Sequence, residues 1–159
     1  MGSFKDFLVE REDRVRAEEA TKEAKKRQWI AAVRSLLERM EVWLKESDPG
    51  NLLRLRTRKV ERREESIGAY VVPILSIDFG SRVVRVEPVA QNVMGPMIEP
   101  REGYWSGRVD LVGPPYKFQL FRFSGSDDLD DWFIRDTRNY RLVPFDKESF
   151  DQALVELFS

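Results

Sequence analysis

The feature that most constrains the fold is a long run without helix-breaking residues. Neither proline nor glycine occurs from Phe4 to Asp48, and the run Asp-Pro-Gly-Asn that begins at Asp48 is a strong stop signal. Ser3, followed three residues later by Asp6, has the spacing of an N-terminal capping box. The sequence therefore predicts one long helix over residues 3–46.

The two halves of this helix differ in character. Residues 10–28 contain little apolar surface apart from Val15 and alanines, and acid–base pairs such as Glu10–Arg14 recur at i, i+4. Each such pair contributes about 0.2–0.5 kcal/mol to an isolated helix, which is typical of a helix solvated on most sides. In the second half, apolar side chains recur at spacings of three and four on one face. They are Trp29, Ile30, Val33, Leu36, Leu37, Met40, Trp43 and Leu44.

Length sets a second constraint on this helix. At 1.5 Å per residue it is roughly 63 Å long, whereas a compact domain of the remaining hundred or so residues has a radius of gyration of about 13 Å. Either the helix breaks near residues 9–13, or residues 1–28 project from the domain. A projecting segment would expose the apolar residues at its tip, Phe4, Phe7 and Leu8.

After the stop signal, the pattern changes to a period of two. Leu53, Leu55 and Thr57 alternate with arginines, which indicates a strand with one solvated face. Turn signals then separate further strands, and Asp146 is placed to cap a last helix. The further strands are expected at residues 67–79, 82–90, 104–112, 116–123 and 132–137, and the helix at 147–158.

This order of elements predicts the fold class. Short connections force neighbouring strands to run antiparallel, and helices then pack on one face of the sheet. We expect an α+β fold with a long N-terminal helix in residues 1–47. A curved antiparallel sheet of about six strands follows in residues 52–159 and ends with the helix 147–158.

Composition excludes several function classes. The chain of 159 residues contains no histidine and no cysteine. Ser-His-Asp and Cys-His nucleophilic sites are therefore excluded, as are zinc fingers, iron–sulfur clusters and disulfides. No phosphate-binding glycine loop and no Gly-x-Ser-x-Gly elbow is present. The sequence favours a non-catalytic protein without a cofactor, and leaves an enzyme open as an alternative.

Acidic residues supply the chemistry of that alternative. A small-molecule-binding or hydrolytic domain could pair two carboxylates near strand ends as acid and base. The candidates are Asp78, Glu87, Glu99, Glu102, Asp110 and Asp136. A separate acidic run lacks the alternating order of a calcium loop and is typical of a solvated turn. Its members are Asp127, Asp128, Asp130 and Asp131.

Aromatic residues and the longest loop are further candidates for binding. The loop at residues 91–103 is long enough to be functional. A curved sheet could enclose a pocket, although such aromatic residues are equally common in cores. The residues that could line it are Tyr104, Trp105, Phe123 and Trp132.

A nucleic-acid-binding module is the first alternative function. Basic side chains on the first strand and its extension could contact phosphates, with Tyr116, Phe118 and Phe121 available for stacking. An isoelectric point of about 5.7 and the glutamates among them weigh against this interpretation. The basic residues are Arg54, Arg56, Arg58, Arg62 and Arg63.

The leading interpretation is an adaptor or accessory subunit that binds a protein partner or a second copy of itself through the long helix. Basic side chains outnumber acidic ones in residues 1–66, and the reverse holds in 67–159, which suits self-contact or an oppositely charged partner. No membrane-spanning segment is visible, and we expect a cytoplasmic protein. The expected partner-binding residues are Phe4, Phe7, Leu8, Trp29, Val33, Leu36, Met40 and Trp43.

Overall fold

A computed structural model of the chain describes residues 2–126 and 130–159. Its first element is a single helix, α1 (Phe4–Ser47). Ser3 and Asp6 form the expected capping box, in which the Asp6 amide donates to Ser3 Oγ and the Ser3 amide donates to the Asp6 carboxylate. After α1, the Asp48 carboxylate accepts hydrogen bonds from the amides of Leu52 and Leu53 at 2.7 and 2.8 Å, which fixes the turn into the sheet.

The described residues form one antiparallel sheet in which each strand pairs with the next along the chain. The predicted α+β class is confirmed, but the sheet has seven strands, not six. The missed strand is too short for a period of two to show. The strands are β1 (Arg54–Glu64), β2 (Gly68–Phe79), β3 (Arg82–Ala90), β4 (Gly103–Gly113), β5 (Tyr116–Gly125), β6 (Asp130–Asp136) and β7 (Leu142–Pro144).

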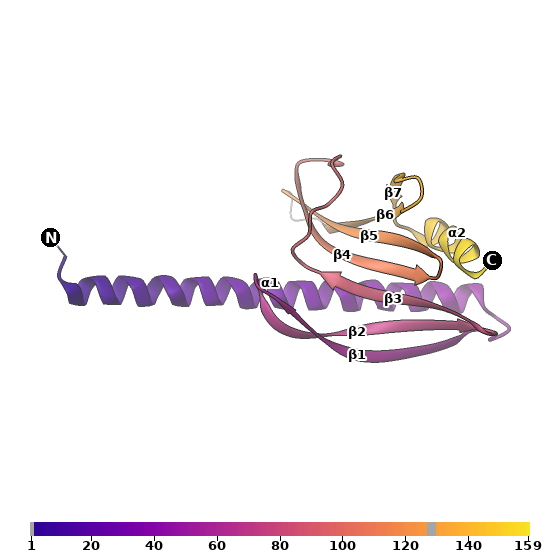
Figure 1. Cartoon of the computed structure of the whole chain (residues 1–159), viewed down its shortest axis with the longest axis horizontal. Coiled ribbons are helices and arrows are strands. Elements are labelled where there is room, and N and C mark those ends of the chain that lie inside the picture. Colours follow the sequence, from indigo (N-terminus) through magenta and orange to yellow (C-terminus); the bar gives the residue numbers. More distant parts are fainter. Residues whose placement is uncertain (1, 127–129) are drawn as a thin grey trace.

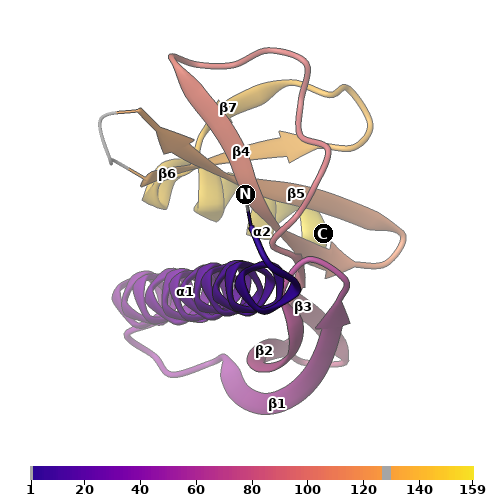
Figure 2. The same ribbon diagram turned by 90° about the vertical axis from the view of Figure 1, so that its left-hand side faces the viewer.

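The sheet curves around α1, which lies on its concave side (Figure 2). A second helix, α2 (Lys147–Phe158), packs on the same side over β3, β4 and β5. Asp146 caps α2, as its sequence predicts. The chain ends lie at opposite ends of the molecule (Figure 1). Because both helices lie on the concave side, neither of them covers the convex face of the sheet.

One apolar core fills the space between the concave face and the two helices. On α1 its buried members begin at Trp29 and end at Leu44. Alternate residues of the strands meet them, because successive side chains of a strand point to opposite faces of the sheet. From the sheet these include Leu75, Ile77, Val84, Val86, Val109, Leu111 and Leu120.

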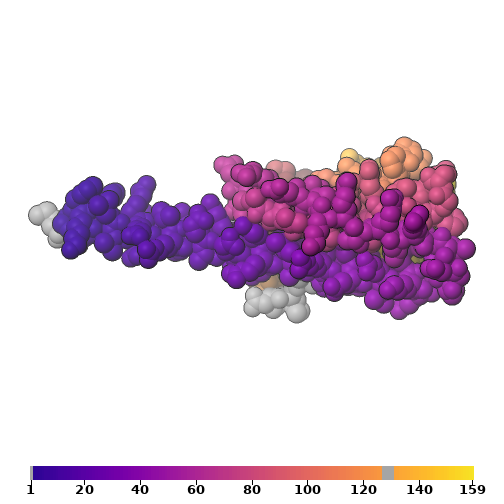
Figure 3. Space-filling model, turned by 90° about the horizontal axis from the view of Figure 1, so that it is seen from below, coloured from indigo at the N-terminus to yellow at the C-terminus, as the bar shows by residue number. Residues whose placement is uncertain are grey.

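The N-terminal part of α1 extends beyond the sheet. The helix is continuous through residues 9–13, and residues 2–25 are all exposed. Figures 1 and 3 show this segment as a straight projection from one end of the molecule. We call residues 4–25 the arm. Of the two alternatives that the helix length left open, the structure has the projecting one.

Candidate functional site

The tip of the arm is a small apolar cluster that contacts no other element. The rings of Phe4 and Phe7 stack with centroids 6.2 Å apart and an interplanar angle of 15°. Phe4 is 74% exposed, Phe7 54% and Leu8 50%. Apolar clusters of this kind on a projecting element usually mark an interaction site, because water is a poor solvent for them.

Three apolar side chains of the arm, Phe4, Leu8 and Val15, lie on the same helical face as the buried residues of α1. Phe4, Leu8, Val15 and Trp29 are separated by four, seven and fourteen residues, which returns each to nearly the same side of an α-helix. Trp29 faces the sheet. The apolar stripe of the arm therefore points to the side on which the sheet lies, beyond the sheet's end.

Four of the expected partner-binding residues lie inside the chain's own core. Trp29, Val33, Leu36 and Met40 are each 0% exposed and pack against the sheet. Trp43 is half-buried, with its ring 5.5 Å from Phe145 and 5.8 Å from Phe150. These residues therefore anchor α1 to the sheet and are closed to a partner. Phe4, Phe7 and Leu8 remain as the exposed members of the set.

The loop between β3 and β4, residues 91–102, lies at the end of the sheet from which the arm projects (Figure 1). It exposes three apolar side chains almost completely: Met94 at 97%, Met97 at 102% and Ile98 at 76%. Sequence reasoning singled out the loop but not these residues. Together with the arm, they place a group of exposed apolar side chains at this end of the molecule.

Two contacts hold this loop in place. At its start, the Glu64 carboxylate accepts hydrogen bonds from the amides of Gln91 and Asn92 at 3.0–3.1 Å and from the Tyr70 hydroxyl. Burial and the Glu64 carboxylate raise the pKa of Tyr70, so that this hydroxyl stays a donor. Further on, the Trp105 indole donates to the Pro96 carbonyl at 2.9 Å.

In the described structure, the four aromatic residues that could line a pocket do not converge on one. Trp105 lies under the loop on the convex side, with its ring 4.9 Å from Phe123. Trp132 lies on the concave side, with its ring 6.2 Å from Trp29, and Tyr104 is 62% exposed. A register shift between Trp105 and Gly107 contributes to this separation. Trp132 therefore packs in the concave core, and Trp105 and Phe123 pack together beneath the loop.

The basic residues of β1 divide into two groups. Arg54, Arg56 and Arg58 are exposed, and Arg56 is paired with Asp78 at 2.9 Å. Arg62 donates to the Pro88 carbonyl at 3.3 Å, which ties β1 to β3, and Arg63 is exposed near the far end of the strand. Arg85 of β3 lies beside the first group. The sequence alone did not predict this neighbour, because the proximity depends on the register of the strands.

The aromatic residues expected near this basic strand lie elsewhere. Phe118 faces the concave core, and Phe121 is 1% exposed beneath the Arg135 guanidinium. Tyr116 lies under Arg138, whose guanidinium carbon is 4.6 Å from its ring centroid. None of the three is available to stack on a ligand held by β1.

Four of the six candidate catalytic carboxylates are engaged in ion pairs. Glu87 and Asp110 lie opposite each other on β3 and β4. Arg85 pairs with Glu87 at 3.1 Å, and Arg108 pairs with Asp110 at 2.8 Å. Asp78 is held by Arg56, as described above. Glu99 and Glu102 belong to the loop, and neither is brought to another candidate carboxylate by an ion pair or hydrogen bond in the described residues.

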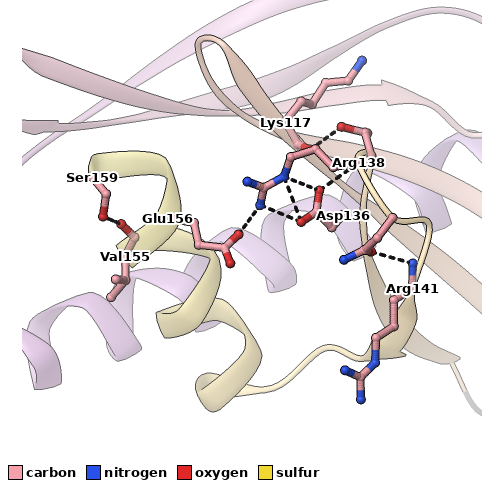
Figure 4. Close-up of polar contacts among 9 residues, drawn as sticks. Lys117, Asp136, Arg138, Arg141, Val155, Glu156 and Ser159 are labelled. Carbon is pink, nitrogen blue, oxygen red and sulfur yellow. Dashed lines mark hydrogen bonds and ion pairs between the residues drawn. The ribbon is translucent and has the colours of Figure 1, made fainter.

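Asp136 belongs to a polar cluster at the end of β6 (Figure 4). The Arg138 guanidinium bonds to Asp136 at 2.6 Å and reaches the Glu156 carboxylate of α2. These hydrogen bonds hold the pKa of Asp136 below its ordinary value, and the same contact raises the pKa of Arg138. The cluster borders a cavity of about 240 Å³, also lined by Phe118 and Ile134. It fastens α2 to the sheet, with the Arg138 guanidinium bound to both carboxylates.

Metal binding finds no support in the part of the chain that the structure describes. Within residues 2–126 and 130–159, no group of three or more acidic side chains could hold an ion. Asp127 and Asp128 lie outside the described residues. Asp131 pairs with Arg101 at 2.6 Å.

Comparisons with known proteins give no identification. No protein-family model matches the chain, and the searches of curated proteins and of solved structures found no match. Among the described helices, none is both long and apolar enough to span a bilayer. The arm, the loop and the sheet surface are therefore the features from which a function can be inferred.

Proposed function

We propose that this chain is a non-catalytic docking subunit that self-associates through its arm. The observation that carries the proposal is the arm itself. It exposes a stripe of Phe4, Leu8 and Val15 on the side where the sheet ends, and nothing in the described chain covers that stripe. The absence of cysteine fits the reducing cytoplasm in which we expect it to act.

A second copy fits this stripe when the two arms pair antiparallel. Val15 is the midpoint between Phe4 and Lys26, so a two-fold axis through Val15 brings the tip of one arm level with Lys26 of the other. There the sheet of the second copy begins. Because each stripe faces the side of its own sheet, each tip ends against the other copy's sheet, next to Met94, Met97 and Ile98.

Charge along the stripe agrees with the antiparallel arrangement. About the same axis, Arg11 of one arm lies opposite Glu19 of the other, while Glu12 lies opposite Glu18. A parallel arrangement would instead place Arg11 opposite Arg11 and Glu18 opposite Glu18. The antiparallel dimer is also closed, because each tip meets the other copy and no apolar tip is left over.

Sedimentation of the full chain over a concentration series tests the proposal. We expect a monomer–dimer equilibrium for the unmodified protein and a monomer for the double variant F4E/L8E. The matched control is A17E/A24E, which adds the same charge on the opposite side of the arm and should still dimerise. An unmodified protein that remains monomeric throughout the series would refute self-association, as would a control that dissociates equally.

A further inference from the structure

The convex face of the sheet has a concavity of about 630 Å³ with basic walls, away from the arm. Arginines supply the charge, Ser76 supplies a hydroxyl, and Ile74, Val83 and Pro114 form an apolar floor. None of the lining residues is acidic. The lining arginines are Arg56, Arg58 and Arg85.

The register of the strands extends this basic surface across the sheet. Arg56 pairs with Ser76, Ser76 with Arg85, Arg85 with Val112, and Val112 with Lys117. These five residues therefore form one row on the convex face, with a cation on every second strand. At about 4.8 Å between strands, the row is roughly 19 Å long. This is longer than a single phosphate group and suits a polymer that carries repeated negative charge.

The cations of this surface are only partly neutralised. The part of the convex face around this row, from residues 54–58 of β1 to Lys117 of β5, carries six cations and three carboxylates, Asp78, Glu87 and Asp110. Lys117 is 3.7 Å from Asp110, and within the described chain Arg54 and Arg58 have no acidic partner at salt-bridge distance. The six cations are Arg54, Arg56, Arg58, Arg85, Arg108 and Lys117. The net charge of this part of the face is therefore positive in a chain whose formal net charge is −1.

The geometry points to this convex surface as a binding site for single-stranded nucleic acid. Arginine forks bind phosphate oxygens in a bidentate manner, and the row offers successive phosphates a track. The apolar floor between the arginines suits the face of an unstacked base, which a duplex keeps hidden. This site is independent of the arm and adds a second function to the proposed docking role.

Fluorescence polarisation with a labelled oligothymidine tests the site on the full chain. We expect binding at 50 mM salt that weakens about 20-fold at 200 mM, as for three phosphate contacts on a single strand. The triple variant R56E/R58E/R85E should lose at least tenfold in affinity. The matched control K25E/R27E/R34E makes the same charge change on exposed positions of α1 and should bind as the unmodified protein does.

Photo-crosslinking of the unmodified protein to the same oligonucleotide avoids dependence on a variant that fails to fold. Peptide mapping should find crosslinks in residues 54–58, 74–76 and 83–85. The inference is overturned by an absence of binding at 50 mM salt, by equal losses in the two triple variants, or by crosslinks confined to other segments. A duplex or a phosphopeptide that competes better than the single strand at equal charge would also overturn it. A negative result for nucleic-acid binding would leave the proposed arm-mediated dimer unaffected. The two proposals are tested separately, because the positions changed in F4E/L8E belong to neither the row nor the concavity.

Discussion

The ring of Trp29 fills the space that Gly107 leaves open on β4. A Cβ atom at Gly107 would lie 2.1 Å from Cζ3 of Trp29, closer than carbon atoms can approach. Trp29 is 0% exposed and is the first buried residue of α1. This contact therefore marks the boundary at which the arm ends and the packed half of the helix begins.

Replacing Gly107 by alanine should destabilise the fold through overpacking at this boundary. We expect the free energy of unfolding in urea to fall by about 1–3 kcal/mol, because the indole must move out of its space. Gly50→Ala is the matched control, since a Cβ at Gly50 has only Leu52 Cγ nearby, at 3.8 Å. Equal stabilities of the two variants would contradict the close approach.

Truncation of Trp29 should destabilise the fold far more than truncation of Phe7, although both are aromatic residues of α1. Trp29→Ala removes a fully buried side chain and should cost about 3–5 kcal/mol of unfolding free energy. Phe7→Ala removes a side chain that is 54% exposed and should change stability by less than about 0.5 kcal/mol in the monomer. Measurements at low protein concentration separate this effect from dimer dissociation.

The arm should be dispensable for folding. Deletion of residues 2–22 removes only exposed side chains, so the unfolding free energy of the remaining chain should change by less than about 1 kcal/mol. Circular dichroism should show a loss of helical signal that corresponds to the deleted turns. A truncated chain that no longer unfolds cooperatively would show that the arm contributes to the fold itself.

Asp136 should contribute stability that depends on pH. Because hydrogen bonds from Arg138 lower the pKa of Asp136 in the folded state, its contribution is present above the unfolded-state pKa and is lost as pH falls through the folded-state value. The unfolding free energies of the unmodified protein and D136N should therefore differ most at neutral pH and converge below about pH 4. Glu10→Gln, on the exposed arm, is the control. A difference that stays constant down to pH 3 would rule out the proposed linkage.

Sequence patterns were sufficient for the elements whose residues repeat regularly. The long helix followed from the absence of proline and glycine together with the apolar spacing after Trp29. The strands before residue 137 followed from alternation between turns. β7 could not be found this way, because its residues Leu142–Pro144 are too few to show a period.

The candidate sites depended on relationships that a linear pattern does not contain. Arg85 and Lys117 join Arg56 only through the register of four strand pairs. Trp105 and Trp132 lie on opposite faces of the sheet, one under the loop and the other against Trp29. The exposed apolar tip of the arm was visible in the sequence, because its length exceeds what the domain can cover.

A single cysteine at position 15 tests the antiparallel dimer most directly. The chain contains no other cysteine, and in the proposed dimer position 15 of each copy lies on the two-fold axis. V15C should therefore form a disulfide-linked dimer under mild oxidation. In L8C the two cysteines would be about 21 Å apart along the helices, far beyond the 7 Å that a disulfide can bridge between Cα atoms, so L8C should stay monomeric under denaturing conditions. Equal linkage of V15C and L8C, or no linkage of V15C, would contradict the account.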